Sequence, residues 1–402
     1  MDAHRAGRHA GVVTRGGRLL RTEAAQTMKL QLVNAVDREG RALGVSLSDG
    51  RLTSSANGRR VDLGGARLLP GLINAHDHLH LNGTLSRLRF RDGYRNVIEW
   101  IADIGPRLST DPALVAHRAQ PRARRLLAGG LKNLLSGVTT VLHHDPRDPV
   151  LDAPDFPVDV PAPAGWSHSL SLDGEAAVRA SREAASTGRP WIIHAAEGVD
   201  SAAALEFDRL AALGCIAPGT LLVHGLGLDA AQQRRMVEAG AGLVWCPCSN
   251  IHLFGRTLDP AWLFERGRLV LGSDSRISGG RDLLDELALV RELTGWPDAR
   301  LEAWVTEGAA HLLGLHDRGR LAPGLRADLV ALPPGLPLSR ATRADLRLVV
   351  VAGRPLYADA DLGDALGLVP VHVDGRAKAI APHLVNAVDE PGLALPAEQA
   401  PA

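Results

Sequence analysis

Strand-like and helix-like segments alternate through the middle of the chain. Runs of strand-like length occupy 68–73, 138–142, 166–172, 191–194, 220–224, 242–245 and 269–274. Segments with helical spacing of apolar residues or helix-type caps occupy 96–104, 112–136, 174–188, 201–213, 229–239, 281–294 and 300–313. Pro121 is expected to kink or split the second helix. Strands alternating with helices from about 68 to 318 predict a parallel sheet.

The predicted strands end repeatedly in histidine or aspartate. His76 and His78 follow the first strand, His194 and His224 end two others, and Asp274 ends the last. A (β/α)8 barrel places its active site at this end of its strands. The competing doubly wound sheet is expected to carry a glycine-rich loop after its first strand, and the histidine pair stands there instead. We therefore predict an α/β fold with a TIM-like (β/α)8 barrel.

Both ends of the chain have a different pattern. From 30 to 69, short apolar runs alternate with turn signals such as Asp49-Gly50, which predicts an antiparallel β module, and short strands return from 319 onward. We expect the two ends to form one β module. The predicted parts are 1–68, a tail and half of this module; 69–318, the barrel; and 319–402, the other half and a second tail.

Composition narrows the function classes. The chain has 402 residues, no net charge, two tyrosines and five phenylalanines, which disfavours a nucleic-acid binder. We find no apolar run of about 18 residues and no secretory leader, so neither a membrane span nor export is expected. Three cysteines are an odd number that fits a reducing cytoplasm, and buried thiols are favoured over metal ligands.

The strand-end residues suggest a metal. Alternate residues of a strand point to the same side, so His76 and His78 are expected to project together as half of a metal site. Two surface histidines are the alternative. Imidazoles with Asp274 would suit Zn²⁺ or Fe²⁺. Glu197 lies three residues after His194 and could serve as a general acid and base beside the metal; a solvated glutamate at a helix start is its alternative.

Further polar and aromatic residues lie near the same predicted edge. A planar ring could stack on Trp166, which could equally belong to the core. Each of the others could also be an ordinary loop or strand-end residue. The candidate pocket residues are His143, His144, Trp166, His168 and Asn250.

Seven motifs, in this order along the chain, carry a family resemblance. They are Pro70-Gly-Leu-Ile-Asn-Ala-His-Asp-His78, Gly137-Val-Thr-Thr-Val141, His194-Ala-Ala-Glu197, Val223-His224, Cys246-Pro-Cys-Ser-Asn250, Gly272-Ser-Asp274 and Gly319-Arg-Leu-Ala-Pro-Gly-Leu-Arg-Ala-Asp-Leu329. Jointly they resemble the amidohydrolase superfamily, specifically its cytosine/guanine deaminase and triazine-hydrolase-like branch. The resemblance implies a (β/α)8 barrel plus a small β-sandwich built from both termini.

The resemblance also implies roles. It makes His76, His78, His194 and Asp274 the metal ligands, places His224 beside the metal, and lets Glu197 shuttle protons. It implies deamination of a cyclic amidine, a nucleobase-, pterin- or triazine-like small molecule, by metal-activated hydroxide, with Asp274 accepting the water proton. Dinuclear relatives usually bridge two metals with a carboxylated lysine. No lysine lies between 132 and 378, so one Zn²⁺ or Fe²⁺ per chain is expected.

The chain departs from that family at one place. Only 50 positions separate His144 from His194, where the family commonly has more, so the barrel is expected to be shortened between its second and fifth strands. This region normally supplies substrate contacts, which leaves other reactions open. A cyclic amide hydrolase resembling imidazolonepropionase and a dechlorinase would use the same site, and a non-catalytic scaffold is the remaining alternative. A homodimer is the base-rate expectation.

Overall fold

The computed structural model describes residues 28–55, 57–83 and 85–388. Both predicted tails, 1–27 and the last dozen residues, lie outside the described residues. The strands are β1 (Leu30–Val36), β2 (Ala42–Ser48), β3 (Arg51–Thr53), β4 (Arg59–Asp62), β5 (Arg67–Pro70), β6 (Leu72–Asp77), β7 (Val138–His143), β8 (Gly165–Ser167), β9 (Trp191–Ala195), β10 (Thr220–His224), β11 (Gly242–Trp245), β12 (Leu269–Leu271), β13 (Leu329–Leu332), β14 (Leu348–Val351), β15 (Arg354–Asp359), β16 (Val369–Val373) and β17 (Arg376–Ile380).

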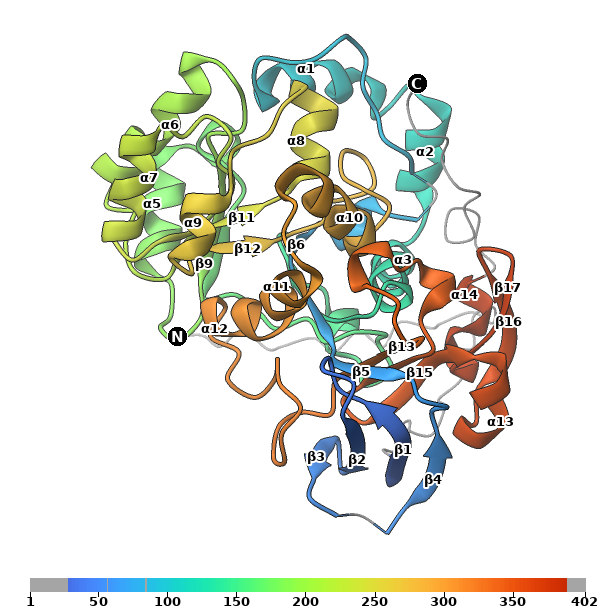
Figure 1. The fold of residues 1–402 in the computed structure, drawn as a ribbon. Coiled ribbons are helices and arrows are strands. Elements are labelled where there is room, and N and C mark those ends of the chain that lie inside the picture. Colours follow the sequence, from blue (N-terminus) through green and yellow to red (C-terminus); the bar gives the residue numbers. More distant parts are fainter. Residues whose placement is uncertain (1–27, 56, 84, 389–402) are drawn as a thin grey trace, which may run out of the picture.

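Helices connect most of the central strands. They are α1 (Val97–Arg107), α2 (Pro112–Ala119), α3 (Arg122–Leu135), α4 (Leu170–Asp173), α5 (Glu175–Glu183), α6 (Ser201–Ala212), α7 (Ala230–Glu238), α8 (Pro247–Phe254), α9 (Ala261–Glu265), α10 (Leu283–Thr294), α11 (Asp298–Ala303), α12 (Ala309–Leu312), α13 (Gly363–Leu366) and α14 (Val385–Val388). Figure 1 shows α5, α6 and α7 stacked along the outer side of the strands β9 and β11.

The helix ends follow from local chemistry. Asp111 caps α2 by accepting from the amides of residues 113 and 114, and Pro112 takes the first helical position. Pro121 separates α2 from α3, as predicted. Asp229 and Gln232 form a reciprocal capping box at the start of α7.

The central strands form two parallel sheets. Strands β8 to β12 pair in the order β12-β11-β10-β9-β8, and β6 pairs with β7. Hydrogen bonds link these sheets at both edges. The amides of Ser273 and Asp274, just past β12, both donate to His76 O in β6 at 3.1 Å, and His144 Nε2, just past β7, donates to Ser167 O of β8 at 2.8 Å. Among the described residues the hydrogen-bonded ladder is therefore a ring of strands with interruptions, not one continuous sheet.

Several strands contribute side chains to the interior of this ring. Side chains from β6, β7, β9, β10, β12 and the β11 end form one buried apolar cluster that includes Ile73, Leu142, Ile192, Val223, Val244 and Val270. A common core of inward-pointing branched residues is what fills a TIM barrel. The fold is TIM-barrel-like, in agreement with the predicted class, although the described strands do not close completely. The region 145–165 contributes the short parallel bridge from Asp159 to Thr140 in place of a full strand-helix unit.

The structure corrects several predicted elements. The predicted strand 68–73 is two strands, β5 and β6, separated at Gly71, where a Cβ atom would lie 2.2 Å from Thr139 Oγ1. The predicted strand 166–172 is wrong beyond Ser167, because Ser169 caps the helix α4 by accepting from the Leu172 amide. The predicted helix 300–313 is continuous only through a π-helical turn, Trp304–Gly308.

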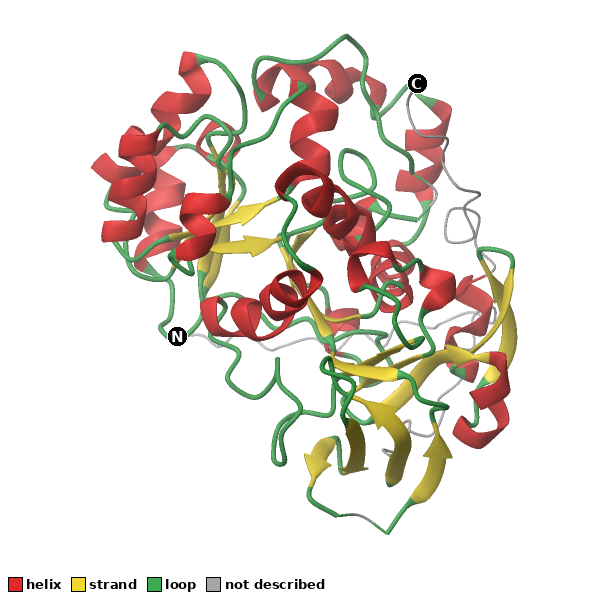
Figure 2. Ribbon diagram, viewed as in Figure 1, coloured by secondary structure: helices red, strands yellow, loops and turns green. Residues whose placement is uncertain are grey.

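Both chain ends contribute strands to one further sheet. Strand β5 pairs antiparallel with β13, which places the N-terminal strands beside the C-terminal ones in a single ten-stranded sheet. Figure 2 shows these strands gathered at the lower right, apart from the central ones. The expectation of a wholly antiparallel module is wrong, because β1 pairs parallel with both β4 and β5. No helix in the described ranges is long and apolar enough to cross a bilayer.

Candidate metal centre

Three histidine nitrogens converge at the carboxyl ends of β6 and β9. His194 Nε2 lies 3.2 Å from His78 Nε2 and 3.3 Å from His76 Nε2. All three side chains are buried. Nitrogens facing one another at this distance repel unless a proton or a cation lies between them. The predicted projection of His76 and His78 to one place agrees with this geometry.

Two of these rings are oriented by a hydrogen bond at Nδ1, the nitrogen that points away from the cluster. His194 Nδ1 donates to His168 O at 2.8 Å, and His78 Nδ1 donates to a carboxylate oxygen of Asp145 at 2.6 Å. Histidines that ligate metals almost always donate their other ring N–H to such an acceptor, because this fixes the tautomer and leaves the facing nitrogen with a lone pair. The third ring, His76, has a buried Nδ1 without a partner among the described residues.

Asp274 supplies the carboxylate of the group. Its Oδ1 lies 3.7 Å from His76 Nε2 and 3.9 Å from His78 Nε2. Its Oδ2 accepts from Ser249 Oγ at 2.8 Å and Ser278 Oγ at 2.7 Å. These bonds hold the carboxylate against the three imidazoles, and a His/Asp donor set of this kind suits Zn²⁺. The structure therefore contains a metal-binding His/Asp cluster.

Burial and neighbouring charges shift the pKa values of the cluster. Burial keeps the pKa values of His76 and His194 below their ordinary value, so their rings are neutral at pH 7. Burial opposes ionisation of Asp274, but its hydrogen bond with His76 and the charge of the surrounding histidines hold its pKa well below the usual range. Burial also lowers the pKa of His78, and the Asp145 carboxylate outweighs this and raises it to about 9.

Glycine lets β12 approach β6 at this point. A Cβ atom on Gly272 would lie 2.7 Å from His76 Cβ and 2.8 Å from Val244 Cγ1. No side chain fits at that distance, so the residue two positions before Asp274 must be glycine for the carboxylate to reach His76. Asp274 itself has a left-handed backbone, with φ of 54°.

A buried network of charged and amide side chains supports the centre. The Asp77 carboxylate, between the two histidines in sequence, accepts from Asn82 and Asn133 and lies 3.0 Å from Lys132 Nζ. Lys132 Nζ also donates to Asp274 O at 2.7 Å. Lys132 lies in α3, as predicted. Through Asp77 and the Asp274 carbonyl, Lys132 ties the end of β6 to the segment after β12. Its side chain does not project from a strand end toward the histidine cluster.

Glu197 and His224 lie together beside the cluster. His224 Nε2 is 3.5 Å from Glu197 Oε1, and His224 Nδ1 donates to Asn250 Oδ1 at 3.1 Å. Asn250 Nδ2 bonds Thr257 Oγ1 at 3.2 Å, which fixes the amide with its oxygen toward the ring. Burial raises the pKa of Glu197 well above its ordinary value and lowers that of His224 to about 4. Burial therefore favours the uncharged form of both groups.

The predicted pocket residues divide into two groups. The rings of His144 and His168 lie 4.3 and 4.7 Å from the His194 ring, and Trp166 meets His144 edge-on at 5.7 Å. His144 also joins the three converging histidines as a potential ligand, which the sequence did not indicate. His143 is separate: it lies beside His80, with ring centroids 6.2 Å apart. Their contact with a substrate stays a prediction.

Sequence reasoning missed several residues of the site. Asp145 follows His143 and His144 directly, so its position after a strand end was a usable signal. Ser278 lies four residues beyond Asp274, where nothing in the pattern marked it. The three cysteines are free and buried, as predicted.

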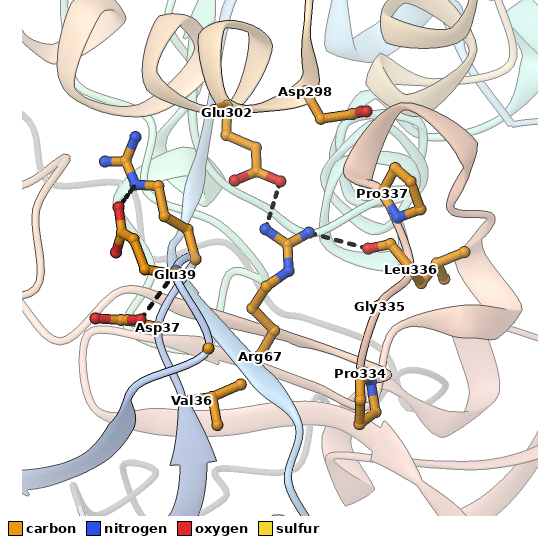
Figure 3. A pocket seen from close by; sticks show the side chains of 13 residues that line it. Val36, Asp37, Glu39, Arg67, Asp298, Glu302, Pro334, Gly335, Leu336 and Pro337 are labelled. Atoms are coloured by element: carbon orange, nitrogen blue, oxygen red, sulfur yellow. Dashed lines mark hydrogen bonds and ion pairs between the residues drawn. The ribbon is translucent and has the colours of Figure 1, made fainter.

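A surface hollow of about 530 Å³ lies elsewhere, between β1, α11 and the loop 334–337. Figure 3 shows Arg67 at its centre, donating to Glu302 Oε1 at 2.5 Å and to Leu336 O at 3.0 Å. None of the clustered histidines lines it. Its polar groups bond one another, so it presents no converging free donors to a ligand.

Comparisons with known proteins agree with the site. The amidohydrolase family profile matches residues 168–356. Over 133 residues the chain is 35% identical to the 8-oxoguanine deaminase of Pseudomonas aeruginosa, covering 30% of this chain and 29% of that protein. Over 228 residues it is 30% identical to the 5-methylthioadenosine/S-adenosylhomocysteine deaminase of Halobacterium salinarum, covering 48% and 52%. The matches thus span between about a quarter and a half of these relatives.

Solved structures share the fold. The atrazine chlorohydrolase from Arthrobacter aurescens complexed with zinc superposes with a TM-score of 0.64 at 18% identity, covering 81% of this chain and 95% of that one. An adenosine deaminase from Xanthomonas campestris with bound zinc superposes with a TM-score of 0.61 at 20% identity, covering 82% and 92%. The match of residues 168–356 to the amidohydrolase family model agrees with the resemblance that the motifs indicated, and the solved structures share the fold of this chain.

Proposed function

We propose that the chain is a mononuclear metal-dependent hydrolase that removes an amino group from a cyclic amidine, a nucleobase-, pterin- or triazine-like ring. The observation that carries this proposal is the position of Glu197. Its buried carboxyl group lies 3.5 Å from His224, whose ring lies 5.5 Å from that of His194. A desolvated carboxyl group with a raised pKa next to a cation site suits general acid catalysis.

One ion would be held at this centre by His76, His78, His194 and Asp274. Zn²⁺ fits these donors, and Fe²⁺ is the other metal that imidazole and carboxylate suit. The zinc in the Arthrobacter and Xanthomonas structures supports zinc here. When bound, the ion would supply Lewis-acid activation of water at neutral pH.

The chain's own groups would move the protons. Asp274 is ionised and held by Ser249 and Ser278, so it can accept a proton from the attacking water. Glu197 would give its proton to a ring nitrogen as water adds to the carbon that bears the amino group. It would then take up the proton that Asp274 received and pass it to the amino group, which leaves as ammonia. The hydroxyl proton of the adduct would return to Glu197 as the carbonyl forms, which restores both carboxyl groups. General acid–base help of this kind is typically worth about 10²–10⁴-fold in rate.

His224 would stabilise the reacting group. Its Nδ1–H is committed to Asn250, which leaves Nε2 directed toward Glu197. In this orientation Nε2 can accept a hydrogen bond from the Glu197 carboxyl group and orient it, and the ring would stabilise charge that develops in the transition state. Trp166 and His168 would contact the ring of the substrate from the 165–168 side.

We also propose how the three parts of the chain divide the work. Residues 69–318 would form the hydrolase barrel, shortened between β7 and β9. Residues 1–68 and 319–402 would contribute the terminal β domain. The short 145–165 region would leave the substrate side of the site more open than a full strand-helix unit does.

A second reaction uses the same groups. Cyclic amide hydrolysis needs the same metal, acid and histidine, and it differs only in which C–N bond breaks. The short 145–165 region favours this alternative, because the segment that would read an exocyclic amino group is reduced.

Ammonia release tests the proposal. Purified, zinc-loaded protein is assayed against cytosine, guanine, adenine nucleosides, pterins and melamine-type triazines, alongside Glu197→Gln. We expect release with at least one ring class and its loss in the variant. Silence across the panel with one zinc bound would instead favour cyclic amide hydrolysis. Silence without any bound zinc would favour a non-catalytic scaffold.

A further inference from the structure

A second group of potential ligands lies next to the first. His80, His143 and Asp145 each offer a ligand atom, and the three atoms all lie within 4.8 Å of one another. His80 lies in the turn Leu79–Leu81 after β6, His143 ends β7, and Asp145 follows two residues later. The group is therefore built on the ends of two paired strands, which hold ligands more firmly than a loop would.

Three polar atoms of this group lack a hydrogen-bond partner among the described residues. His143 Nε2 and His80 Nδ1 are buried and have no hydrogen-bond partner in the described ranges. The contacts of Asp145 with His78 and His80, at 2.6 and 3.4 Å, both use Oδ2. Its Oδ1 makes no hydrogen bond within the described part of the chain. Buried nitrogens without partners are rare and call for water or an ion.

Local contacts can leave His143 Nε2 with a lone pair. His143 Nδ1 lies 3.4 Å from Asp77 O, which can only accept, and 3.3 Å from the Leu79 amide, which can only donate. The two contacts correspond to the two neutral tautomers. A cation at Nε2 selects the tautomer whose Nδ1–H donates to Asp77 O.

The charges around the group favour a cation. Asp77 is already paired with Lys132 at 3.0 Å. Arg122, the nearby positive charge, lies 3.8 Å from Asp148 and donates to Pro146 O at 2.9 Å. Asp145 contributes one negative charge, which it shares with His78 through the 2.6 Å contact of its Oδ2. The His80 and Asp145 side chains keep 14% and 15% of their surface exposed, which gives an ion an entry path.

We infer that His80, His143 and Asp145 form a second divalent-cation site, suited to Zn²⁺ by its two imidazoles and one carboxylate. Asp145 joins it to the first centre, because Oδ2 accepts from His78 while Oδ1 is available to the second ion. The site needs no bridging lysine. It is independent of the reaction proposed above.

This inference is tested by measuring how many zinc ions each chain binds at a controlled concentration of free zinc. Full-length protein is stripped with a chelator, dialysed against zinc buffers and analysed by elemental mass spectrometry. We expect two zinc ions per wild-type chain at saturation and one in His143→Ala. His311→Ala, a change of an exposed histidine outside both groups, is the matched control and should keep two. Circular dichroism confirms that each variant is folded, and His80→Gln replaces His143→Ala if that variant is not.

The outcomes separate this inference from the proposed function. One zinc per wild-type chain, with ammonia release intact, overturns the second site and leaves the proposed function standing. Two zinc ions in both His143→Ala and His80→Gln also overturn it. A crystal soaked in zinc should show two anomalous peaks, one among His76, His78 and His194 and one at His80, His143 and Asp145; a single peak contradicts the inference.

Discussion

His224 Nε2 lies 3.5 Å from Glu197 Oε1. A residue with a left-handed backbone conformation lies at the first of these positions and immediately before the second. His224 itself has φ of 73°, and Ala196, immediately before Glu197, has φ of 52°. Such conformations of non-glycine residues cost about 1–3 kcal/mol each and persist where the surrounding structure enforces them, which is common at functional sites. The two strand ends thus turn inward to bring an acid and an imidazole together.

Glu197→Gln should therefore lower turnover by about 10²–10⁴-fold, because the amide cannot donate an acidic proton. The variant should keep its metal, since Glu197 lies outside the converging nitrogens. Ammonia release and zinc content are measured together. Glu175→Gln, a change in a surface carboxylate paired with Arg209, is the control and should match the wild type. Equal turnover in Glu197→Gln would remove this residue from the mechanism.

The periodicity of the sequence was sufficient for the barrel strands and for their chemistry. His76, His78, His194, His224 and Asp274 all lie at one end of the ring of strands, because the carboxyl ends of parallel strands meet there. Glu197 was predictable for the same reason. The resemblance supplied the roles of these residues, and the roles stay predictions.

Other features depended on contacts that no local pattern records. The break at Gly71 arises from Thr139, 68 positions away in sequence, and the parallel pairing of β1 with β4 and β5 is equally non-local. His144 joins the cluster only because β7 lies beside β6. Lys132 was placed in a helix correctly, but its bonds to Asp77 and the Asp274 carbonyl needed the three-dimensional structure.

Lys132→Met should destabilise the protein by about 3–5 kcal/mol, because it leaves the buried Asp77 carboxylate without its counter-ion. It also frees the carbonyl of Asp274, so zinc should bind more weakly. Urea unfolding and zinc titration measure the two effects. The double variant Asp77→Asn/Lys132→Met removes both charges and should recover part of the loss. A loss under about 1 kcal/mol in the single variant would mean that water replaces the ammonium group.

Gly272→Ala should reduce both stability and zinc content. Its Cβ atom would lie 2.7 Å from His76 Cβ and 3.1 Å from Cys246 Sγ, and overpacking of this kind typically costs about 1–3 kcal/mol. Gly105→Ala is the matched control, because the added Cβ meets nothing within 4 Å in the helix α1. It should be neutral or stabilising by up to about 1 kcal/mol. Wild-type zinc content in Gly272→Ala would show that β12 can move away from His76.

The buried carboxyl group of Glu286 should contribute less to the stability of the fold as pH rises from about 5 to 8. This carboxyl group is fully buried and accepts from the Cys248 amide at 3.0 Å and the Gly280 amide at 3.2 Å. Burial outweighs these bonds and raises its pKa from 4.5 to about 8. Between these values the folded protein holds a proton that the unfolded chain has lost. The contribution of Glu286 to the free energy of unfolding should therefore decrease with pH, by at most about 1.4 kcal/mol per unit.

Glu286→Gln removes this titration, so the slope of its urea midpoint against pH between 5 and 8 should be more positive than that of the wild type. The absolute stability of the variant should be lower, because its amide nitrogen cannot accept from one of the two backbone N–H groups. The slope against pH is therefore the deciding quantity. Glu292→Gln, a change on the exposed side of the same helix, should keep the wild-type slope. Equal slopes in Glu286→Gln and the wild type would mean that the two amide donors keep Glu286 ionised in the folded protein.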